Sequence, residues 1–359
     1  MILPGDKSKN KSNAAEVAKM TIKCLKENVP SEVPGIAFLS GGQTEVEATE
    51  NLYEINNILG LVAQNHNLTR FDLDNPPHGQ FEGVDVVIDL SGPKAKREWA
   101  DLASSIKLWQ LVSTGFDSFD LNYWQKKGIP TANTPGTSSA IALAENALMF
   151  MIMLSRCWHE TQIHLDKSIV GIPIGTELKN RRLGLIGFGA SATALAKRAM
   201  NFSMKISAID IRQVSQEEQK ELGVDFFGGP NELDEVLSHS DFISLHLHLN
   251  QDTHHLMNDT KFRLMKPTAF LINVARGALV DESALYTALT EKRLAGAGLD
   301  VFSKEPIDPK SPLLLLPNVI ATPHTAGQTD GTLENRINMV VENLNRVACG
   351  LEPIYRIDQ

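Results

Sequence analysis

The stretch RLGLIGFGASATALAKRAMNFSMKISAID, residues 182–210, decides the fold. Its first apolar run, Leu183 to Ile186, predicts a buried strand, and a second apolar run, Ile206 to Ile209, ends on an acid, Asp210. Between the two runs, a glycine-containing turn leads into a helical pattern of apolar residues. Strand, tight turn, helix, strand and acid in this order predict a dinucleotide-binding βαβ unit.

Each position of the turn has a physical reason. Gly187 permits the tight turn, Gly189 lets backbone approach a pyrophosphate, and Ala192 is small enough for the helix to pack near the strand. The free N–H groups at the helix start favour phosphate charge. Glycine turns that bind nothing are common, so the interpretation depends on the flanking strands and on Asp210, which follows Gly189 by 21 residues and can accept hydrogen bonds from a ribose.

Composition sets the class of protein. A chain of 359 residues with 42% hydrophobic and 21% charged residues predicts two globular domains. The net charge of −9 argues against nucleic acid as a partner. Three widely spaced cysteines favour reduced thiols in the cytoplasm. The start lacks an apolar signal-peptide core. The apolar run Ala142 to Leu154 contains Glu145 and is short, so we expect a buried helix and no membrane segment.

The pattern along the chain predicts an α/β fold with two doubly wound parallel-sheet domains. We expect an N-terminal extension at residues 1–33, a flavodoxin-like substrate domain at 34–132 plus 328–359, and a Rossmann NAD-binding domain at 133–327. The turn Asn133-Thr134-Pro135-Gly136 indicates the boundary.

Local patterns place the elements. We expect strands at Gly35–Leu39, Leu68–Leu73, Val84–Ile88, Leu108–Val112, Ile129–Ala132, Phe242–Leu247, Ala269–Asn273, Gly296–Asp300 and Val319–Ala321. We expect helices at 13–26, 45–65, Lys96–Ala103, Leu121–Lys127, Ser139–Leu154 and Leu333–Ala348, the last returning to the first domain.

The opening 57 residues resemble a late part of a class I fructose-bisphosphate aldolase, most specifically in FLSGGQ followed by an acidic helix. In that family the turn that here is Ser40-Gly41-Gly42 holds a substrate phosphate. The family's Schiff-base lysine precedes the matching region and has no counterpart here, so we expect these residues to have a structural role only. The strand at Gly35–Leu39 would then begin the substrate domain.

A second resemblance covers about residues 82–355. The strings GIPTANTPGTSSAIALAENAL, SDFISLHLHLN, KPTAFLINVARGALVDESAL, LAGAGLDVFSKEP and LPNVIATPHTAGQT, with the turn at GFGASA, are similar to those of D-isomer-specific 2-hydroxyacid dehydrogenases. The resemblance places the catalytic residues at Arg276, Glu305 and His324. Taken singly, an arginine near a strand end or a histidine in a loop is more often structural. Their order within these strings favours catalysis.

The chemistry of these residue types agrees with that implication. Arg276 offers two parallel donors to the carboxylate of a 2-oxoacid. His324 can donate a proton to the carbonyl oxygen as it is reduced, and Glu305 would orient the ring and raise its pKa.

The resemblance also implies the residues around the cofactor. The cofactor-binding set is Gly187, Gly189, Ala190, Ser191, Ala192, Asp210, His246, Thr253, Val274, Ala275, Asp300 and Gly327. Backbone at Ser91 and Gly92 would hold the substrate carboxylate together with Arg276. Ala190 replaces a longer polar residue and Ala192 a glycine of the family. His248, His254 and His255 are interpreted as surface residues, and no metal site is expected.

We therefore expect a cytoplasmic, homodimeric, NAD-dependent dehydrogenase that interconverts a small 2-oxoacid and its D-2-hydroxyacid. Glyoxylate, hydroxypyruvate or another small 2-oxoacid is favoured over a phosphoglycerate-type substrate. Leu90-Ser91 stands where phosphoglycerate dehydrogenases of the family usually have an Arg-Ser pair, although Lys94, Lys96 and Arg97 follow. Two alternatives remain: a catalytically silent NAD-sensing protein on the same fold and, from the opening residues, an aldolase-type lyase. A turnover assay separates them.

Overall fold

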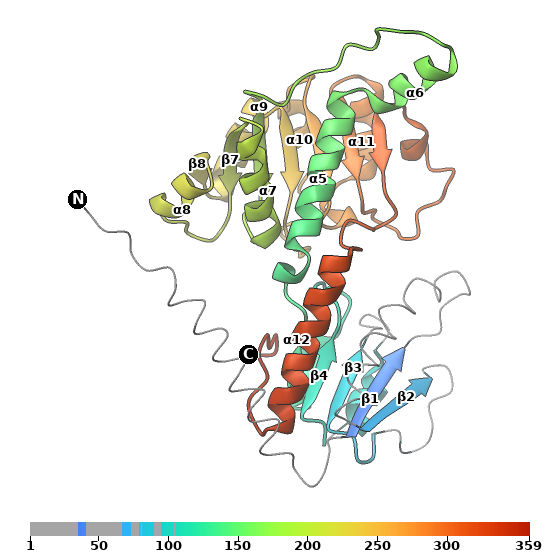
Figure 1. The fold of residues 1–359 in the computed structure, drawn as a ribbon, viewed down its shortest axis with the longest axis vertical. Helices are drawn as coiled ribbons and strands as arrows, with labels where there is room; N and C mark the ends of the chain where they lie inside the picture. The colour runs from blue at the N-terminus through green and yellow to red at the C-terminus, as the bar shows by residue number, and fades with distance from the viewer. Residues whose placement is uncertain (1–34, 41–66, 73–78, 80, 90–94, 104) are drawn as a thin grey trace, which may run out of the picture. The chain divides into compact units, whose positions relative to one another are not determined.

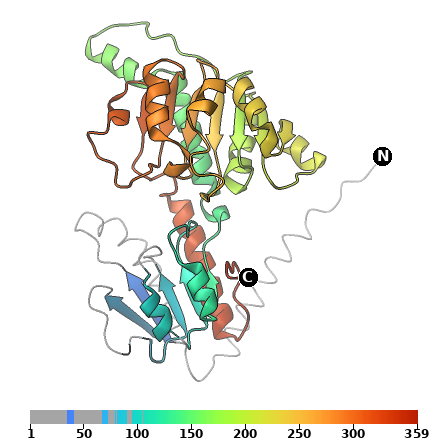
Figure 2. The same ribbon diagram turned by 180° about the vertical axis from the view of Figure 1, so that it is seen from behind.

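The structure is a computed structural model that describes residues 35–40, 67–72, 79, 81–89, 95–103 and 105–359. The chain forms two compact units, residues 1–135 with 334–359, and residues 136–333. Both are drawn in Figure 1 and, from behind, in Figure 2. We refer to them as unit 1 and unit 2.

Unit 1 contains a parallel sheet. Among the described residues its strands are β1 Gly35–Ser40, β2 Asn67–Asp72, β3 Val86–Asp89, β4 Leu108–Leu111 and β5 Thr131–Ala132, and its helices include α3 Arg97–Leu102 and α4 Leu121–Lys126. The strand order is β2-β1-β3-β4-β5, which is the flavodoxin-like order. The predicted strand at Gly35–Leu39 is thus confirmed, and it lies inside the sheet between β2 and β3. The helices predicted at 13–26 and 45–65 lie outside the described residues.

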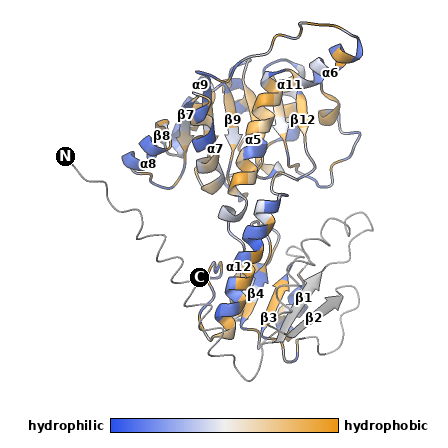
Figure 3. Cartoon of the chain, in the orientation of Figure 1, coloured by the Kyte–Doolittle hydropathy of each residue, from blue (hydrophilic) through white to orange (hydrophobic). Residues whose placement is uncertain are grey.

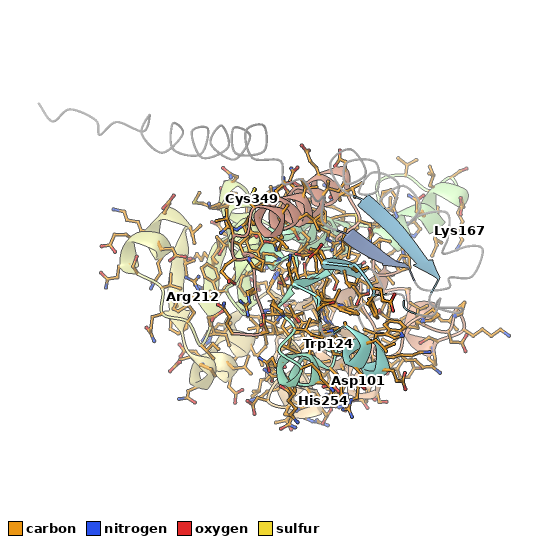
Figure 4. All side chains as sticks on the ribbon, turned by 90° about the horizontal axis from the view of Figure 1, so that it is seen from below. Asp101, Trp124, Lys167, Arg212, His254 and Cys349 are labelled. Atoms are coloured by element: carbon orange, nitrogen blue, oxygen red, sulfur yellow. The ribbon has the colours of Figure 1, made fainter. Side chains whose placement is uncertain are left out.

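A tryptophan pair forms the centre of the unit 1 core. Trp109 of β4 and Trp124 of α4 are fully buried and meet edge to face, with ring centroids 5.2 Å apart. The Trp109 indole N–H donates to the buried carboxylate of Asp89 over 2.8 Å. Figure 4 labels Trp124 among the surrounding side chains. Carboxylate and indole therefore satisfy each other at the carboxyl end of β3.

The C-terminal helix α12, Asp330–Ala348, joins unit 1 through a buried amide pair. The Asn343 side-chain amide donates to Gln110 Oε1 of β4 over 2.7 Å and also donates to the carbonyl of Ile354. The amide N–H of Ile354 donates back to Asn343. Both amide side chains are fully buried. Residues far apart in the sequence are thereby fixed in one unit.

Unit 2, described throughout, contains a parallel sheet of seven strands in the order β12-β11-β10-β9-β6-β7-β8. The strands are β6 Arg182–Ile186, β7 Lys205–Ile209, β8 Val224–Gly228, β9 Phe242–Leu245, β10 Phe270–Asn273, β11 Gly296–Leu299 and β12 Val319–Ala321. The helices are α5 Ala140–Ser155, α6 Trp158–Asp166, α7 Ala190–Asn201, α8 Gln216–Glu221, α9 Leu233–His239, α10 Asp259–Leu264 and α11 Glu282–Thr290. This is the doubly wound Rossmann order, and the expected fold class is confirmed. The order reverses between β6 and β9, where ligands bind in such sheets.

Helices cover both faces of this sheet. Helices α5 and α7 pack on one face, and α9, α10 and α11 lie on the other (Figure 1). The close approach of α5 depends on glycine, because a methyl group on Gly298 of β11 would lie 2.6 Å from Phe150 Cβ. Figure 3 shows how apolar α5 is, and its buried side chains explain that composition.

No single helix among the described residues is long and apolar enough to cross a membrane. The bent pair of α5 and α6 passes that test together, but much of α5 is core.

The sequence interpretation missed one strand, β8. Its sequence VDFFG lies at the sheet edge, where only Val224 is buried, so it carries no continuous apolar signal. Other differences concern boundaries: α12 begins at Asp330, three residues before the expected start, β9 ends at Leu245, before His246, and β3 and β5 each begin two residues later than expected. Differences of this size are usual, because the ends of helices and strands fray and their assigned bounds vary by one or two residues.

Candidate active site

The glycine turn after β6 has the backbone that the sequence predicts. Gly187 has φ +86°, and a Cβ there would lie 2.6 Å from the His246 carbonyl oxygen. Only glycine fits this conformation and this contact. Gly189 differs, because a Cβ there would meet nothing within 4 Å. The open space lies at the start of α7, whose first residues are Ala190 and Ser191, while Ala192 is fully buried against the sheet.

His246 follows β9 and is held between two hydroxyl groups. Its Nδ1 lies 2.9 Å from Ser191 Oγ on α7, and its Nε2 lies 2.9 Å from Ser244 Oγ. Burial lowers the pKa of His246 to about 3. The ring is therefore neutral at physiological pH and acts as a hydrogen-bonding link between β9 and the first turn of α7.

Asp210 lies directly after β7 and also contacts the glycine turn. Its Oδ2 accepts from the Phe188 N–H at 2.5 Å, and its Oδ1 accepts from the Arg212 N–H at 2.7 Å. A cavity of about 350 Å³ adjoins it, lined by Asp210, Gln213, Phe226, Phe227, Gly228, Gly229 and Glu232. The carboxylate thus stands between the turn and a hollow, as expected for a ribose-binding acid.

The loop after β10 contains Val274, Ala275 and Arg276. Asn273, the last residue of β10, fixes this loop: its side-chain oxygen accepts from the Ala275 N–H at 3.1 Å, and its amide donates to the Arg276 carbonyl at 2.9 Å. Val274 and Ala275 are buried. Gly277 follows, where a Cβ would overlap the Phe302 carbonyl group. The Arg276 backbone is therefore closely confined by its neighbours.

Asp300, at the end of β11, organises the loop that carries His324. Its carboxylate accepts from the Thr322 hydroxyl at 2.5 Å, the Thr325 N–H at 2.8 Å and the Ala326 N–H at 3.0 Å. Its carbonyl accepts from the His324 N–H at 2.8 Å. Because the carboxylate is buried, these bonds are difficult to replace by water.

His324 and Glu305 form the closest charged contact of the site. His324 Nδ1 lies 2.7 Å from Glu305 Oε2, while the second carboxylate oxygen accepts from the Phe302 N–H at 2.9 Å. The bond to Glu305 raises the pKa of His324, and partial burial opposes that shift. Burial acts to raise the pKa of Glu305, but the bonds from His324 and Phe302 outweigh it and hold the pKa below its ordinary value. Carboxylate and imidazolium therefore stabilise each other.

The structure brings the three predicted catalytic side chains together. The positive charge of Arg276 acts on both partners of the pair and lowers the pKa of Glu305 and of His324. One Arg276 Nη1–H also donates to the Ala275 carbonyl at 2.7 Å. All three residues lie beyond the carboxyl ends of β10, β11 and β12, where parallel strands end at one sheet edge.

The remaining predicted residues have more varied places. Thr253 lies in the turn after β9, where its hydroxyl donates to the His248 carbonyl over 2.8 Å. Gly327 follows the His324 loop, and its carbonyl accepts from the Thr329 N–H. Ser91 and Gly92 lie outside the described residues.

Sequence reasoning missed three positioning residues. It gave no role to Asn273 or Thr322, which hold the loops of Arg276 and His324, or to Glu218, which pairs with Arg212. Asn273 ends β10 and Thr322 directly follows β12. A polar residue at the carboxyl end of a strand was the available signal for both. Glu218 carries no such signal, because its partner lies six residues away on another element.

No group of three histidine, cysteine, aspartate or glutamate side chains suited to a metal ion occurs in the described part of the chain. His254 and His255 stack on each other, with ring centroids 4.0 Å apart, and form no such group.

Comparison with known proteins agrees with this geometry. Residues 148–326 match the model of the D-isomer specific 2-hydroxyacid dehydrogenase NAD-binding domain. A glyoxylate reductase of Korarchaeum cryptofilum is 35% identical over 296 residues, which cover 78% of this chain and 84% of that protein. A glyoxylate reductase of Thermococcus litoralis is 36% identical, over 77% of this chain and 86% of its own length. This chain belongs to the D-isomer-specific 2-hydroxyacid dehydrogenase family.

A solved structure and a second family model add to this finding. A D-lactate dehydrogenase from Aquifex aeolicus, complexed with NAD and lactic acid, has a TM-score of 0.75 and 28% identity, over 90% of this chain and 99% of its own. Residues 1–69 match the model of class I fructose-bisphosphate aldolase. The chain therefore combines an aldolase-like opening segment with a dehydrogenase. The described part of that segment supplies β1 and the first residues of β2.

The residues present fit a dinucleotide. The open space at Gly189, the start of α7, and Asp210 beside a cavity provide room, N–H donors and a ribose acceptor in one place.

Proposed function

We propose that this NAD-dependent 2-hydroxyacid dehydrogenase reduces glyoxylate to glycolate, or hydroxypyruvate to the corresponding D-2-hydroxyacid. The residues proposed to act are Arg276, Glu305 and His324. One observation carries the proposal: the His324–Glu305 pair, at 2.7 Å, stands with Arg276 at the carboxyl edge of a sheet that has the NAD-binding strand order. The resemblance of the chain to two glyoxylate reductases supports the choice of substrate.

His324 is proposed as the proton donor. Its Nδ1 is engaged by Glu305, so Nε2 is the nitrogen that can hold a proton for the substrate oxygen. Because the pKa of His324 is raised, the ring stays protonated to a higher pH than an ordinary histidine. The side chain is half exposed, which leaves it accessible to a small molecule. General acid catalysis of this kind contributes roughly 10²- to 10⁴-fold.

Arg276 is proposed to bind the substrate carboxylate. Its guanidinium presents paired donors in one plane, and its positive charge stabilises the negative charge that develops on the reacting oxygen. The backbone of Ser91 and Gly92 is predicted to assist, and Val274, Ala275, Asp300 and Thr253 are predicted to line the cofactor. NADH supplies the hydride when bound.

We propose NADH over NADPH as the cofactor. Asp210 offers two oxygens to ribose hydroxyls and would repel a 2′-phosphate. The measurement is kcat/KM with each cofactor at saturating 2-oxoacid. A higher value with NADPH contradicts this assignment.

A homodimer formed through unit 2 is also proposed. Large apolar side chains are exposed on α5, on α6 and in the segment that follows, including Ile163, Val170 and Ile174, the last two 93% and 88% exposed. Such a surface is unusual for a monomer. Light scattering measures the molar mass in solution. We expect the unmodified protein to be a dimer and the variant with glutamate at Val170 and Ile174 to be a monomer. An unmodified protein that is itself monomeric contradicts the proposal.

A cytoplasmic location and two functional domains complete the proposal. The substrate domain is proposed at residues 34–132 plus 328–359 and the NAD-binding domain at 133–327, with internal boundaries three and six residues before those of the two compact units. The thiol of Cys157 is free, which is the state favoured in a reducing compartment.

The decisive experiment is a panel of 2-oxoacids, including glyoxylate, hydroxypyruvate, pyruvate and phosphohydroxypyruvate, in which NADH consumption is followed. We expect the highest kcat/KM with glyoxylate or hydroxypyruvate. If NADH binds but no member of the panel is reduced, the catalytically silent NAD-sensing alternative replaces this proposal.

A further inference from the structure

Arg212 is the cationic side chain next to the proposed ribose acid. It lies two residues after Asp210, and its backbone N–H donates to the Asp210 carboxylate. Its guanidinium lies across the glycine turn, where one Nη2–H donates to the Phe188 carbonyl at 2.9 Å. Phe188 also donates its N–H to Asp210. Cation and carboxylate thus contact the same residue of the turn, and Arg212 is within reach of any group bound at Asp210.

Glu218 already forms an ion pair with Arg212. Both terminal nitrogens of Arg212 lie 3.3 Å from Glu218 Oε1, and Nη1 lies 3.4 Å from Oε2. Glu218 is itself fixed at the start of α8, where its N–H donates to Ser215 Oγ at 3.1 Å. The Arg212 guanidinium is therefore held between a carboxylate and a backbone carbonyl. Figure 4 labels Arg212 in the pale yellow part of the ribbon.

We propose that Glu218 is a specificity-determining residue that excludes NADPH by keeping Arg212 paired. A 2′-phosphate carries nearly two negative charges and is bound in other proteins by arginine. Here the local charge of Asp210, Arg212 and Glu218 sums to −1, so the arginine cannot compensate for a phosphate. Rejection of NADPH then has two parts: direct repulsion by Asp210, and neutralisation of Arg212 by Glu218. This inference deepens the proposed preference for NADH.

A consequence is that the two carboxylates act together. Removing Asp210 alone leaves Arg212 paired, and removing Glu218 alone leaves the repelling acid in place. Removing both should expose a free arginine next to the ribose position. Because residues in one charged network are energetically coupled, the double variant should gain more than the product of the single gains.

The test measures equilibrium binding. Fluorescence titration gives the dissociation constants of NADPH and NADH, and calorimetry gives that of 2′,5′-ADP. The variants are Asp210→Asn, Glu218→Gln, their combination, and the combination with Arg212→Ala. Glu217→Gln is the matched control, since it removes one charge from the same turn of α8 without removing the pair with Arg212.

We expect Glu218→Gln to tighten NADPH binding about threefold to fivefold, in line with an exposed ion pair, with NADH within twofold. The NADPH affinity of the double variant should exceed the product of the two single gains by more than tenfold. Adding Arg212→Ala to the double variant should abolish this excess. If Glu217→Gln has the same effect as Glu218→Gln, or if the double variant is only additive, the inference is wrong. Failure of NADH itself to bind would instead contradict the proposed cofactor.

Discussion

The glycine turn and the catalytic cluster of unit 2 are built in opposite ways. The turn is made by consecutive residues: Gly187 to Gly189 lie between β6 and α7, and Ala190 to Ala192 are the first residues of α7. The cluster joins Arg276, Glu305 and His324, which are separated by 29 and 19 residues and come from three loops. The turn works through its backbone and through missing side chains, whereas the cluster works through charged side chains: His324 and Glu305 are hydrogen-bonded, and the charge of Arg276 acts on both.

The glycine turn and the catalytic cluster are vulnerable to opposite kinds of substitution. A turn made by backbone conformation fails when a side chain is added, and a cluster made by side chains fails when one is removed. Substitutions in the two regions should therefore separate cofactor binding from turnover.

His324→Ala should remove most of the turnover and leave the cofactor bound. Loss of the proposed proton donor should lower kcat by about 10²- to 10⁴-fold, while the dissociation constant for NADH stays within about twofold, because the glycine turn is unchanged. Stopped-flow turnover and fluorescence titration measure the two quantities. His239→Ala, on the exposed end of α9, is the control. Near-normal turnover of His324→Ala would remove it from the mechanism.

Arg276→Lys should lower kcat/KM for the best 2-oxoacid by about 10²-fold although the charge is kept. Lysine cannot present two parallel donors to a carboxylate, and the bond from Arg276 to the Ala275 carbonyl is also changed. Steady-state kinetics and NADH titration measure the effect. Arg263→Lys on α10, whose partner is the surface Asp259, controls for the exchange itself. An unchanged kcat/KM excludes Arg276 as the carboxylate ligand.

Gly187→Ala and Gly189→Ala compare two kinds of failure within the turn. Gly187→Ala adds a methyl group at φ +86° and close to the His246 carbonyl, so both stability and NADH affinity should fall, stability by roughly 1–3 kcal/mol. Gly189→Ala adds a methyl group in open space, so the melting temperature should hold while NADH affinity falls about tenfold. Equal melting temperatures for the two variants would contradict this account.

The sequence was sufficient for the regions built from local signals. The two doubly wound sheet domains followed from apolar runs and the helices between them, and the glycine turn followed from consecutive residues, whereas the order of the strands comes from the structure. The catalytic residues were identified by resemblance, because no local sequence pattern links Glu305 to His324. The bonds of Asp300 to Thr322 and of Glu218 to Arg212 could not be predicted, because they depend on loop conformations that tertiary packing selects. Strand β8 was missed because edge strands need little apolar sequence.

Glu305→Gln should produce the smallest of these effects and the most specific one. Reduction of the oxoacid requires protonated His324, so activity is lost as pH rises through the pKa of that ring. In the unmodified protein Glu305 raises this pKa, which places the loss above the ordinary pH range for histidine. A neutral amide retains hydrogen bonding but removes the negative charge, so the pKa of His324 should fall, and the basic limb of kcat/KM should move to lower pH. NADH affinity should not change. A pH–rate profile in the direction of reduction measures the shift, and the reverse reaction provides an internal control, because it needs the deprotonated ring and its acidic limb should move in the same direction. If both limbs stay in place while kcat falls, Glu305 only orients the ring and does not set its charge.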